Sequence, residues 1–218
     1  IEFIDDKIYI KNAQNFDLEQ TLDCGQAFRW SKDDSSVWSG IAFGRYIKLW
    51  QDGDNIIISG SSKQDFNNIW QSYFDLERDY AKIIKEVSSN PTIKKAADYS
   101  SGIRLLNQQP WEALISFIIS QNNNIPRIKG IIDRLCQSFG EKIPGGYTFP
   151  SAEVVANLTV EDLSVIRSGF RAKYILDAAN KVVSGEIDLE ALKTADYDTA
   201  RQKLMTIKGV GPKVADCV

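Results

Sequence analysis

The most informative absence in this 218-residue chain is histidine, which does not occur once. Without an imidazole, the chain cannot form the Ser-His or Cys-His pairs that activate many nucleophiles, and it cannot bind a metal through histidine. Proton transfer must then be carried out by Lys, Asp, Glu or Tyr side chains. The absence directs the search for chemistry towards these four residue types.

Cysteine is also scarce, because only Cys24, Cys136 and Cys217 occur and they form no Cys-x-x-Cys pair. This spacing favours reduced thiols and predicts neither a disulfide framework nor a zinc or iron–sulfur site. No apolar run is long enough to cross a bilayer, and residues 1–11 alternate like a strand rather than like an export signal. We therefore expect a globular protein that is neither secreted nor bound to a membrane.

The chain also lacks an excess of basic residues. It has 26 Lys and Arg against 29 Asp and Glu, a net charge of −3 and a pI of about 5.2. Nucleic-acid-binding proteins are usually basic, so this balance counts against a partner attracted by a global positive field. A local site built from backbone N–H groups and a few cations remains compatible with it.

The residue pattern predicts an α+β protein with a β-rich first part and a helical second part. From Ile1 to about Ser61, apolar and polar residues alternate between turn residues, as in an antiparallel meander. Residues 63–74 and 76–87 then carry helical spacing, and the polar stretch 88–91 breaks the chain. We predict an N-terminal antiparallel β-sheet domain with flanking helices at residues 1–90 and an all-α domain at residues 91–218.

Start and stop signals divide the second part into helices. Pro110 suits a first helical turn, and apolar residues follow it on one face. The polar residues 120–124 interrupt this helix, and a second amphipathic run from Ile125 ends at Gly140. Thr159 and Asp162 predict the cap of a short helix, and a longer helix is expected over residues 171–183.

The most informative pattern that is present is a glycine-framed turn within residues 207–216. Gly209 and Gly211 allow a tight reversal of the backbone, and Pro212 suits the first position of a new helix. The unpaired N–H groups of such a helix start can hold a phosphate. Lys213 follows in the first turn, where its amine can serve as a nucleophile.

This pattern resembles the helix-hairpin-helix of base-excision DNA glycosylases, in which a hydrophobic residue, Gly-Val-Gly and a lysine follow one another. Four earlier segments resemble successive signatures of the 8-oxoguanine DNA glycosylase family, in that family's order. They are Asp23–Trp30, Tyr73–Leu76, Ser120–Ile125 and Gly169–Tyr174. A hairpin alone is a weak signal because many DNA-binding proteins have one, but the ordered set argues against chance.

The resemblance implies that Lys213 is the catalytic residue and that the hairpin binds DNA phosphate. The hairpin residues concerned are Lys208, Gly209, Val210 and Gly211. It also implies a lesion-base pocket at Gly25, Phe28 and Cys217. In this pocket the Gly25 carbonyl would accept a hydrogen bond from the N7–H that 8-oxoguanine has and guanine lacks. An unpaired buried acceptor costs roughly 1–3 kcal/mol, so this single contact would give a tenfold to hundredfold preference.

Four other residues are implied in handling the duplex once a base has left the stack. Phe170 corresponds to the family's wedge between base steps, and Asn122 corresponds to its gap-filling asparagine. Arg127 and Arg171 correspond to the two arginines that contact the opposite cytosine. The resemblance therefore predicts double-stranded DNA with 8-oxoguanine opposite cytosine as the partner.

The implied reaction is attack of Lys213 on the sugar C1′, followed by a Schiff base and a strand nick by β-elimination. No cofactor is required, although carbonyls of the hairpin would suit a structural cation. We expect a monomer in the cytoplasm at a bacterial nucleoid, or in a nucleus. The family's catalytic aspartate and its readers of the pairing edge are expected past Val218, because Asp216 does not match that aspartate; a chain truly ending there is expected to have little activity.

Other interpretations stay open from the residues themselves. A second helix-hairpin-helix glycosylase class, acting on oxidised pyrimidines or alkylated purines, would share the hairpin; the alkylation enzymes lack the lysine. A non-catalytic DNA-binding module would keep the hairpin without using Lys213. Taken singly, Lys213 and Arg171 fit solvated surface residues, Phe170 fits a core aromatic, and Cys217 fits a buried thiol.

Overall fold

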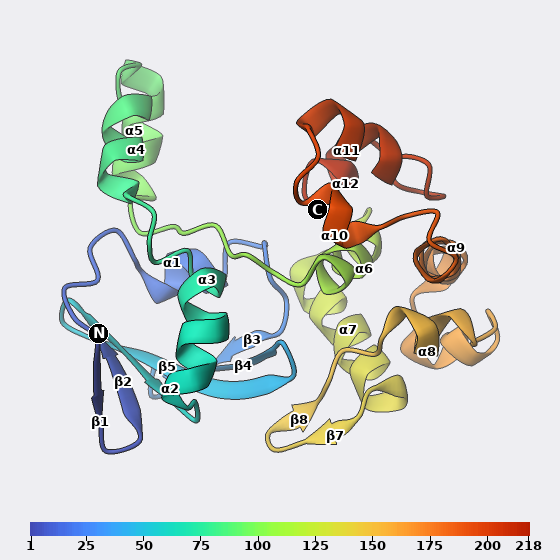
Figure 1. Ribbon diagram of the computed structural model, residues 1–218, viewed down its shortest axis with the longest axis horizontal. Helices are drawn as coiled ribbons and strands as arrows, with labels where there is room; N and C mark the ends of the chain where they lie inside the picture. The colour runs from blue at the N-terminus through green and yellow to red at the C-terminus, as the bar shows by residue number, and fades with distance from the viewer. The chain divides into compact units, whose positions relative to one another are not determined.

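The computed structural model describes residues 1–218, which form two compact units, Ile1–Asn107 and Gln108–Val218. The first unit contains a six-stranded antiparallel sheet, and the second is almost entirely helical (Figure 1). This is the α+β architecture that the residue spacings predicted. None of the helices combines the length and the apolarity needed to span a bilayer.

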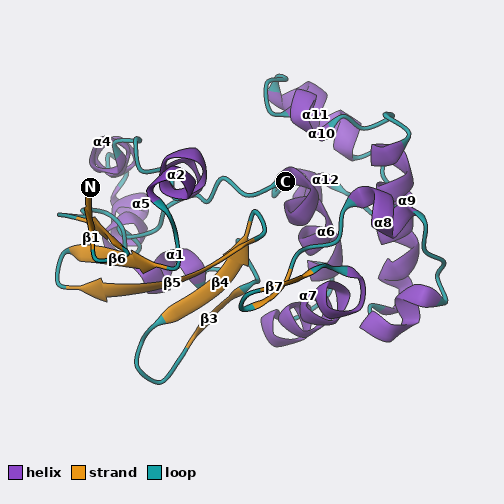
Figure 2. Ribbon diagram, turned by 60° about the horizontal axis from the view of Figure 1, so that its bottom comes forward, coloured by secondary structure: helices purple, strands orange, loops and turns teal.

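The sheet of the first unit has the strand order β1-β2-β6-β5-β4-β3, with all neighbours antiparallel (Figure 2). Strands β3 to β6 form the expected meander, whereas the β1–β2 hairpin adds to its far edge by pairing β2 with β6. The strands are β1 (Glu2–Ile4), β2 (Lys7–Ile10), β3 (Trp30–Lys32), β4 (Trp38–Ala42), β5 (Arg45–Asp52) and β6 (Asn55–Ser59).

Large aromatic side chains fill the core between the sheet and its helices. Trp30 lies opposite Gly40 on the neighbouring strand, and a Cβ at Gly40 would come within 2.3 Å of the Trp30 ring. The glycine therefore makes room for the indole, which is 1% exposed and donates from Nε1 to the Tyr73 hydroxyl at 2.9 Å. Trp70 and Phe74 complete this cluster and are fully buried.

The helices of the first unit are short, and four of them begin at a residue whose side chain caps the first turn. Asp17, Ser62, Asp79 and Asn90 each accept a hydrogen bond from the first turn of the helix that follows, as expected of good N-cap residues. The elements are α1 (Leu18–Leu22), α2 (Lys63–Asp65), a π-helical turn (Phe66–Trp70), α3 (Gln71–Tyr73), α4 (Tyr80–Val87) and α5 (Pro91–Tyr99).

The sequence predicts a domain boundary after residue 90, whereas the first compact unit continues to Asn107. Side chains that precede residue 90 hold the segment 102–106. Its amides at Gly102, Arg104 and Leu106 donate to the side chains of Gln20, Thr21 and Gln26, respectively. The segment thus belongs to the β-rich unit, because of hydrogen bonds that no sequence pattern predicts.

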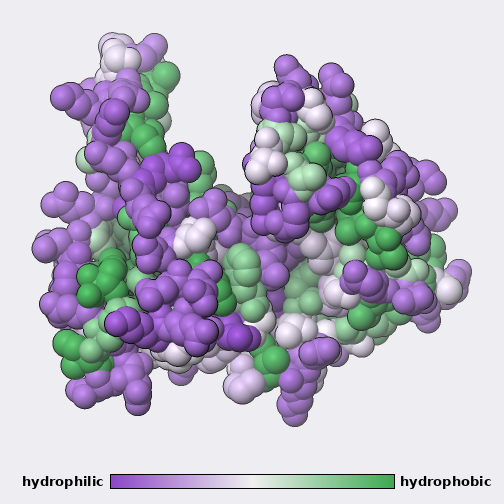
Figure 3. All heavy atoms as spheres, in the orientation of Figure 1, coloured by the Kyte–Doolittle hydropathy of each residue, from purple (hydrophilic) through white to green (hydrophobic).

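The helices α4 and α5 bury little surface. Only Tyr80 is buried in α4, and no residue is buried in α5. Hydrophobic side chains along this pair are visible at the surface (Figure 3), and Ile93 and Tyr99 are 48% and 87% exposed.

The second unit contains the helices that the start and stop signals predicted. Its elements are α6 (Pro110–Ser120), α7 (Ile125–Phe139), a small hairpin of β7 (Lys142–Ile143) and β8 (Gly146–Tyr147), α8 (Ala152–Ala156), 3-10 turns at Asp162–Ile166 and Gly169–Arg171, α9 (Ala172–Val183), α10 (Leu189–Leu192), α11 (Tyr197–Leu204) and α12 (Pro212–Ala215). Gly140 ends α7 with an extended backbone rather than a left-handed one. A Cβ there would lie 2.0 Å from the Thr148 carbonyl oxygen, which explains the glycine.

Candidate active site and nucleic-acid interface

The glycine-framed turn forms the predicted hairpin between α11 and α12. Gly209 has φ of +80°, and the Val210 N–H donates to the Ile207 carbonyl at 3.0 Å, which closes the turn. Ile207 and Val210 are buried and fix the turn to the helical core. Pro212 occupies the first position of α12, as its missing N–H favours.

Lys213 projects from the exposed side of α12, whereas the next residues, Val214 and Ala215, are buried. The Lys213 side chain forms no ion pair or hydrogen bond with the rest of the chain. An amine on a short helix that two buried residues anchor, and that has no partner in the chain, can attack an electrophile that reaches it. The geometry therefore suits the nucleophile predicted at this position.

The hairpin residues differ in what they can offer a phosphate. The N–H groups of Lys208 and Val210 already donate within the chain, to Asp177 Oδ2 at 2.8 Å and to Ile207. Those of Gly209 and Gly211 have no acceptor in the chain. The Lys208 side chain is 75% exposed, and its ammonium lies 3.5 Å from Asp177 Oδ1. Backbone contacts to a phosphate thus fall to the two glycines, and Lys208 can contribute only its charge.

Arg171 lies deeper than a surface arginine at a helix start would. It is 2% exposed, and its guanidinium donates to main-chain carbonyls of Gln121, Asn122 and Ser168. Burial lowers the pKa of Arg171, and the positive charge of nearby Arg127 lowers it further. Nη1 makes one of its two possible donations, so one N–H is left for a ligand. Arg171 therefore also has a structural role, because it stabilises the turn after α6 through these hydrogen bonds.

That turn presents the other candidates for the opposite strand. Asn122 is exposed with φ of +46°, and Arg127 is exposed in the first turn of α7. Asn124 caps α7 by accepting the Arg127 N–H at 3.0 Å. Phe170 is 54% exposed, and the Arg171 guanidinium carbon lies 4.5 Å from its ring centroid. The structure brings Asn122 and Arg171 into direct contact and places Phe170 over the same guanidinium.

The first unit contains Gly25 and Phe28, the other residues predicted for the lesion pocket. Gly25 has φ of +85°, and Phe28 is 6% exposed. The neighbouring Gln26 has a role that the sequence did not assign. Its Nε2 donates to the carbonyls of Thr21 and Arg104 at 2.9 and 2.7 Å, and its Oε1 accepts the Leu106 N–H at 3.0 Å. The only sequence signal for a role of Gln26 is its position inside the Gly-Gln-Ala-Phe-Arg-Trp segment.

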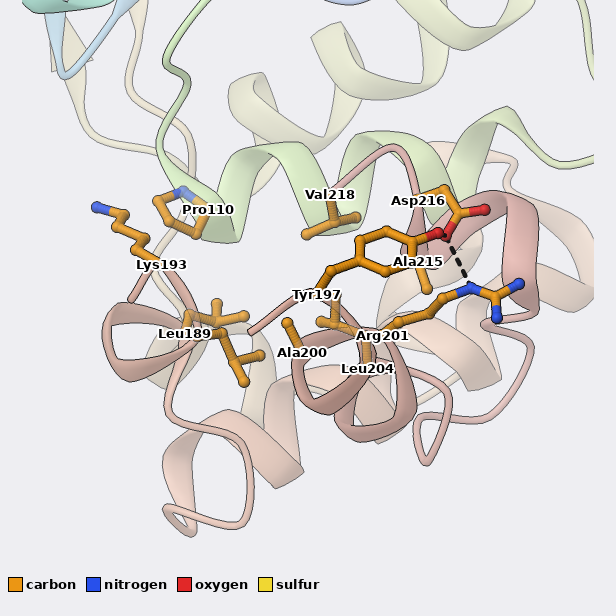
Figure 4. A pocket seen from close by; sticks show the side chains of 11 residues that line it. Pro110, Leu189, Lys193, Tyr197, Ala200, Arg201, Leu204, Ala215, Asp216 and Val218 are labelled. Atoms are coloured by element: carbon orange, nitrogen blue, oxygen red, sulfur yellow. Dashed lines mark hydrogen bonds and ion pairs between the residues drawn. The ribbon is translucent and has the colours of Figure 1, made fainter. Parts of the chain in front are cut away.

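Cys217 and Asp216 follow α12. The Cys217 thiol is free and exposed, which differs from the buried thiol that the residue taken singly suggested. Asp216 Oδ1 accepts from the Tyr197 hydroxyl at 2.7 Å and pairs with Arg201 Nε at 2.8 Å (Figure 4). The hydrogen bond to Asp216 raises the pKa of Tyr197. These contacts tie the end of α12 to α11 beside a largely apolar cavity of about 230 Å³ that Leu189 also lines.

Two domain families match consecutive parts of the chain. Residues 8–114 match the N-terminal domain of 8-oxoguanine DNA glycosylase, and residues 115–213 match the HhH-GPD superfamily of base excision DNA repair proteins. The N-glycosylase/DNA lyase of Saccharomyces cerevisiae is 35% identical over 95% of this chain, and the N-glycosylase/DNA lyase OGG1 of Arabidopsis thaliana is 33% identical over 92%. This chain spans 63% and 59% of the length of these two relatives.

Solved structures extend the similarity to three dimensions. One is the Clostridium acetobutylicum 8-oxoguanine glycosylase/lyase in complex with double-stranded DNA containing cytosine opposite 8-oxoguanine. It is 39% identical, with a TM-score of 0.96 over 99% of this chain and 76% of its own. MBOgg1 in complex with a low-affinity DNA ligand is 44% identical, with a TM-score of 0.95 and the same coverage of 99% and 76%.

Proposed function

Because the chain belongs to the 8-oxoguanine DNA glycosylase family, we propose that it excises 8-oxoguanine from duplex DNA and then nicks the abasic strand. The observation that carries this proposal is Lys213, an unpaired amine on a short helix that a glycine hairpin introduces. A lysine nucleophile explains both activities, since one amine can break the glycosidic bond and then open the sugar.

The chemistry follows from the amine. The Lys213 nitrogen bonds to C1′ as the bond between C1′ and the base breaks, and the base departs with the electron pair and gains a proton. Opening of the sugar ring converts the adduct to a Schiff base, which acidifies the proton on C2′. Loss of that proton expels the 3′ phosphate by β-elimination, and hydrolysis of the imine returns the free lysine.

The base must leave the stack before Lys213 can reach the sugar, and the second unit offers groups for that step. We assign Phe170 as the wedge, because more than half of its side chain is exposed. Asn122 would fill the gap, and Arg127 with the remaining N–H of Arg171 would contact the opposite cytosine. Gly209, Gly211 and the Lys208 ammonium would bind a phosphate.

The proposed partner is double-stranded DNA with 8-oxoguanine opposite cytosine, bound by a monomer. Gly25 and Phe28 of the first unit and Cys217 of the second are each proposed to contact the lesion base. The reaction needs no cofactor, although a cation bound to hairpin carbonyls would be compatible with it. The protein would act at a bacterial nucleoid or in a nucleus.

The deciding experiment uses the full-length protein and compares Lys213→Gln with Lys203→Gln, which removes an equal charge from an exposed site on α11. Borohydride should trap the unaltered protein and Lys203→Gln on an 8-oxoguanine:cytosine duplex, and Lys213→Gln should give no trapped complex. Base release should fall by about 1,000-fold or more, which corresponds to roughly 4 kcal/mol of barrier. Equal base release by Lys213→Gln would refute the proposal, and preference for thymine glycol or alkylated duplexes would favour another hairpin glycosylase class.

A further inference from the structure

One face of α9 lies against the hairpin that carries the proposed nucleophile. Tyr174 and Asp177 lie one helical turn apart on this helix, and Phe170 precedes Tyr174 by four residues. The spacing of three residues places the Tyr174 and Asp177 side chains on the same side of α9, and Phe170 lies in the 3-10 turn just before this helix. Phe170 is the proposed wedge, whereas neither Tyr174 nor Asp177 has a role in the chemistry described above.

Tyr174 is packed directly against the turn. A Cβ built on Gly209 would come within 2.4 Å of Tyr174 Cδ2 and 2.6 Å of Cε2. The ring therefore occupies the space that any other residue at position 209 would need. Two features require glycine at position 209, its positive φ and its close approach to the Tyr174 ring. The close approach depends on where α9 places that ring.

Asp177 holds the residue just before that glycine. Its Oδ2 accepts the Lys208 N–H at 2.8 Å, and its Oδ1 lies 3.5 Å from the Lys208 ammonium. The Asp177 side chain is 14% exposed, so the bond to the amide is shielded from competing water. An acidic group beside a turn that is proposed to bind phosphate is electrostatically unfavourable for DNA, so the contribution of Asp177 at this turn is its hydrogen bond to the Lys208 N–H.

Tyr174 also contacts the proposed wedge. Its ring meets the Phe170 ring edge to face, with centroids 5.8 Å apart and an interplanar angle of 73°. Tyr174 thus touches both the wedge and the hairpin turn. From the other side, the pairing of Asp216 with Arg201 and Tyr197 fixes the end of α12.

We propose that Tyr174 and Asp177 are positioning residues that set the hairpin turn, and through it Lys213, at a fixed place relative to Phe170. This inference rests on the proposed function, because it concerns how the same nucleophile is aimed. A displacement of about 1 Å at a reacting group can cost on the order of 100-fold in rate, so two contacts at the turn are sufficient to matter.

The test uses paired variants of the protein. Tyr174→Ala and Asp177→Ala remove each contact, whereas Tyr174→Phe keeps the ring and Asp177→Asn keeps an acceptor for the Lys208 N–H. Hydrogen exchange at residues 208–213 should become at least about tenfold faster in the alanine variants, and exchange in α6 and α7 should not change. The conservative variants should match the unaltered protein in both regions.

Single-turnover trapping on an 8-oxoguanine:cytosine duplex measures the consequence. Each alanine variant should trap about 10- to 100-fold more slowly, and each conservative variant should stay within about threefold of the unaltered protein. Binding to a duplex with an uncleavable abasic analogue should change less than the trapping rate does. A purely structural role would lower the amount of folded protein and leave the rate per folded molecule unchanged.

The two readouts separate the two claims. Alanine variants that fold and keep unaltered exchange at residues 208–213, or unaltered trapping rates, would overturn the positioning role. If the unaltered full-length protein forms no trapped complex, the proposed function fails, and the exchange measurement still decides whether α9 positions the turn.

Discussion

Two glycine turns, one in each compact unit, have nearly the same positive φ and different supports. Gly25 has φ of +85° and Gly209 has φ of +80°. The turn at Gly25 is next to Gln26, whose carboxamide bonds to the main-chain groups of Thr21, Arg104 and Leu106. The turn at Gly209 is supported by an aromatic face and a carboxylate.

The difference suits the chemistry proposed for each turn. Recognition of N7–H by a carbonyl depends on direction, and neutral hydrogen bonds fix direction without adding a charge near an uncharged base. A hairpin that faces phosphate and carries an amine already lies in a charged environment, so a carboxylate in its support is less disruptive there. A glycine with positive φ is therefore supported in each turn by groups that suit the ligand proposed for that turn.

The largest effect is expected at the second turn, for Gly209→Ala. The added methyl group would overlap the Tyr174 ring and adopt an unfavourable φ, so the free energy of unfolding should fall by about 3 kcal/mol. Gly211→Ala is the matched control, because a Cβ there meets nothing within 4 Å. Thermal or denaturant unfolding measures both. Equal losses in the two variants would contradict the role of the Tyr174 ring.

A smaller effect is expected at the first turn, for Gln26→Met. The substitution keeps the length of the side chain and leaves the Leu106 N–H and two carbonyls without Gln26, at a cost of about 1–3 kcal/mol. The ratio of 8-oxoguanine to guanine excision should fall by about tenfold, while cleavage of a preformed abasic site should not change. Gln71→Met, which removes only an exposed bond to Glu77, is the control. Unchanged discrimination in Gln26→Met would separate Gln26 from the Gly25 turn.

The smallest effect is a pH dependence confined to the first unit. The Tyr80 hydroxyl donates to Asp75 and accepts the Leu105 N–H, next to the segment that Gln26 holds. Burial is the main cause of the raised pKa of Tyr80, and the nearby Asp75 raises it further. The neutral phenol is therefore favoured by folding, so its contribution is complete below pH 10 and is lost as the pH rises through the raised pKa.

Tyr80→Phe should accordingly lower the stability of the first unit by about 1 kcal/mol at neutral pH. It should also reduce the difference between neutral and alkaline stability. Hydrogen exchange at Leu105, measured between pH 8 and 11 and corrected for the intrinsic rate, checks both expectations. Alkaline loss of protection that is equally large in Tyr80→Phe would assign the effect to other groups.

The regular elements of the fold could be read from the sequence because burial imposes a period on the residues that form them. The sheet over residues 1–61 and the helices that begin at Pro110 and Ile125 were predicted from that period. The pairing of β2 with β6 was not, since pairing between distant strands leaves no local signal. The C-terminal boundary of the first unit also depends on contacts between residues far apart in the sequence. These are the hydrogen bonds from the N–H groups of segment 102–106 to the side chains of Thr21 and Gln26.

The sequence predicts which residues belong to the candidate site better than it predicts the contacts that these residues make. Resemblance pointed to Lys213, Phe170 and Arg171, and charge alone suggested that Arg171 lies at the surface. Its burial depends on carbonyls of a turn about 50 residues earlier, which only the folded chain brings to it. Asp177 had no signal, because a single acid on a polar helix face looks like any solvated residue.

The buried guanidinium of Arg171 has a further consequence for recognition. Transfer of a cation out of water is among the most expensive steps in forming a polar contact, and for this side chain the transfer takes place as the polypeptide folds. A base that hydrogen-bonds to Arg171 would therefore not have to displace water from the guanidinium, because that group is already buried. Selectivity at this position would then reflect the shape and hydrogen-bond pattern of the incoming base, with little contribution from dehydration of the arginine.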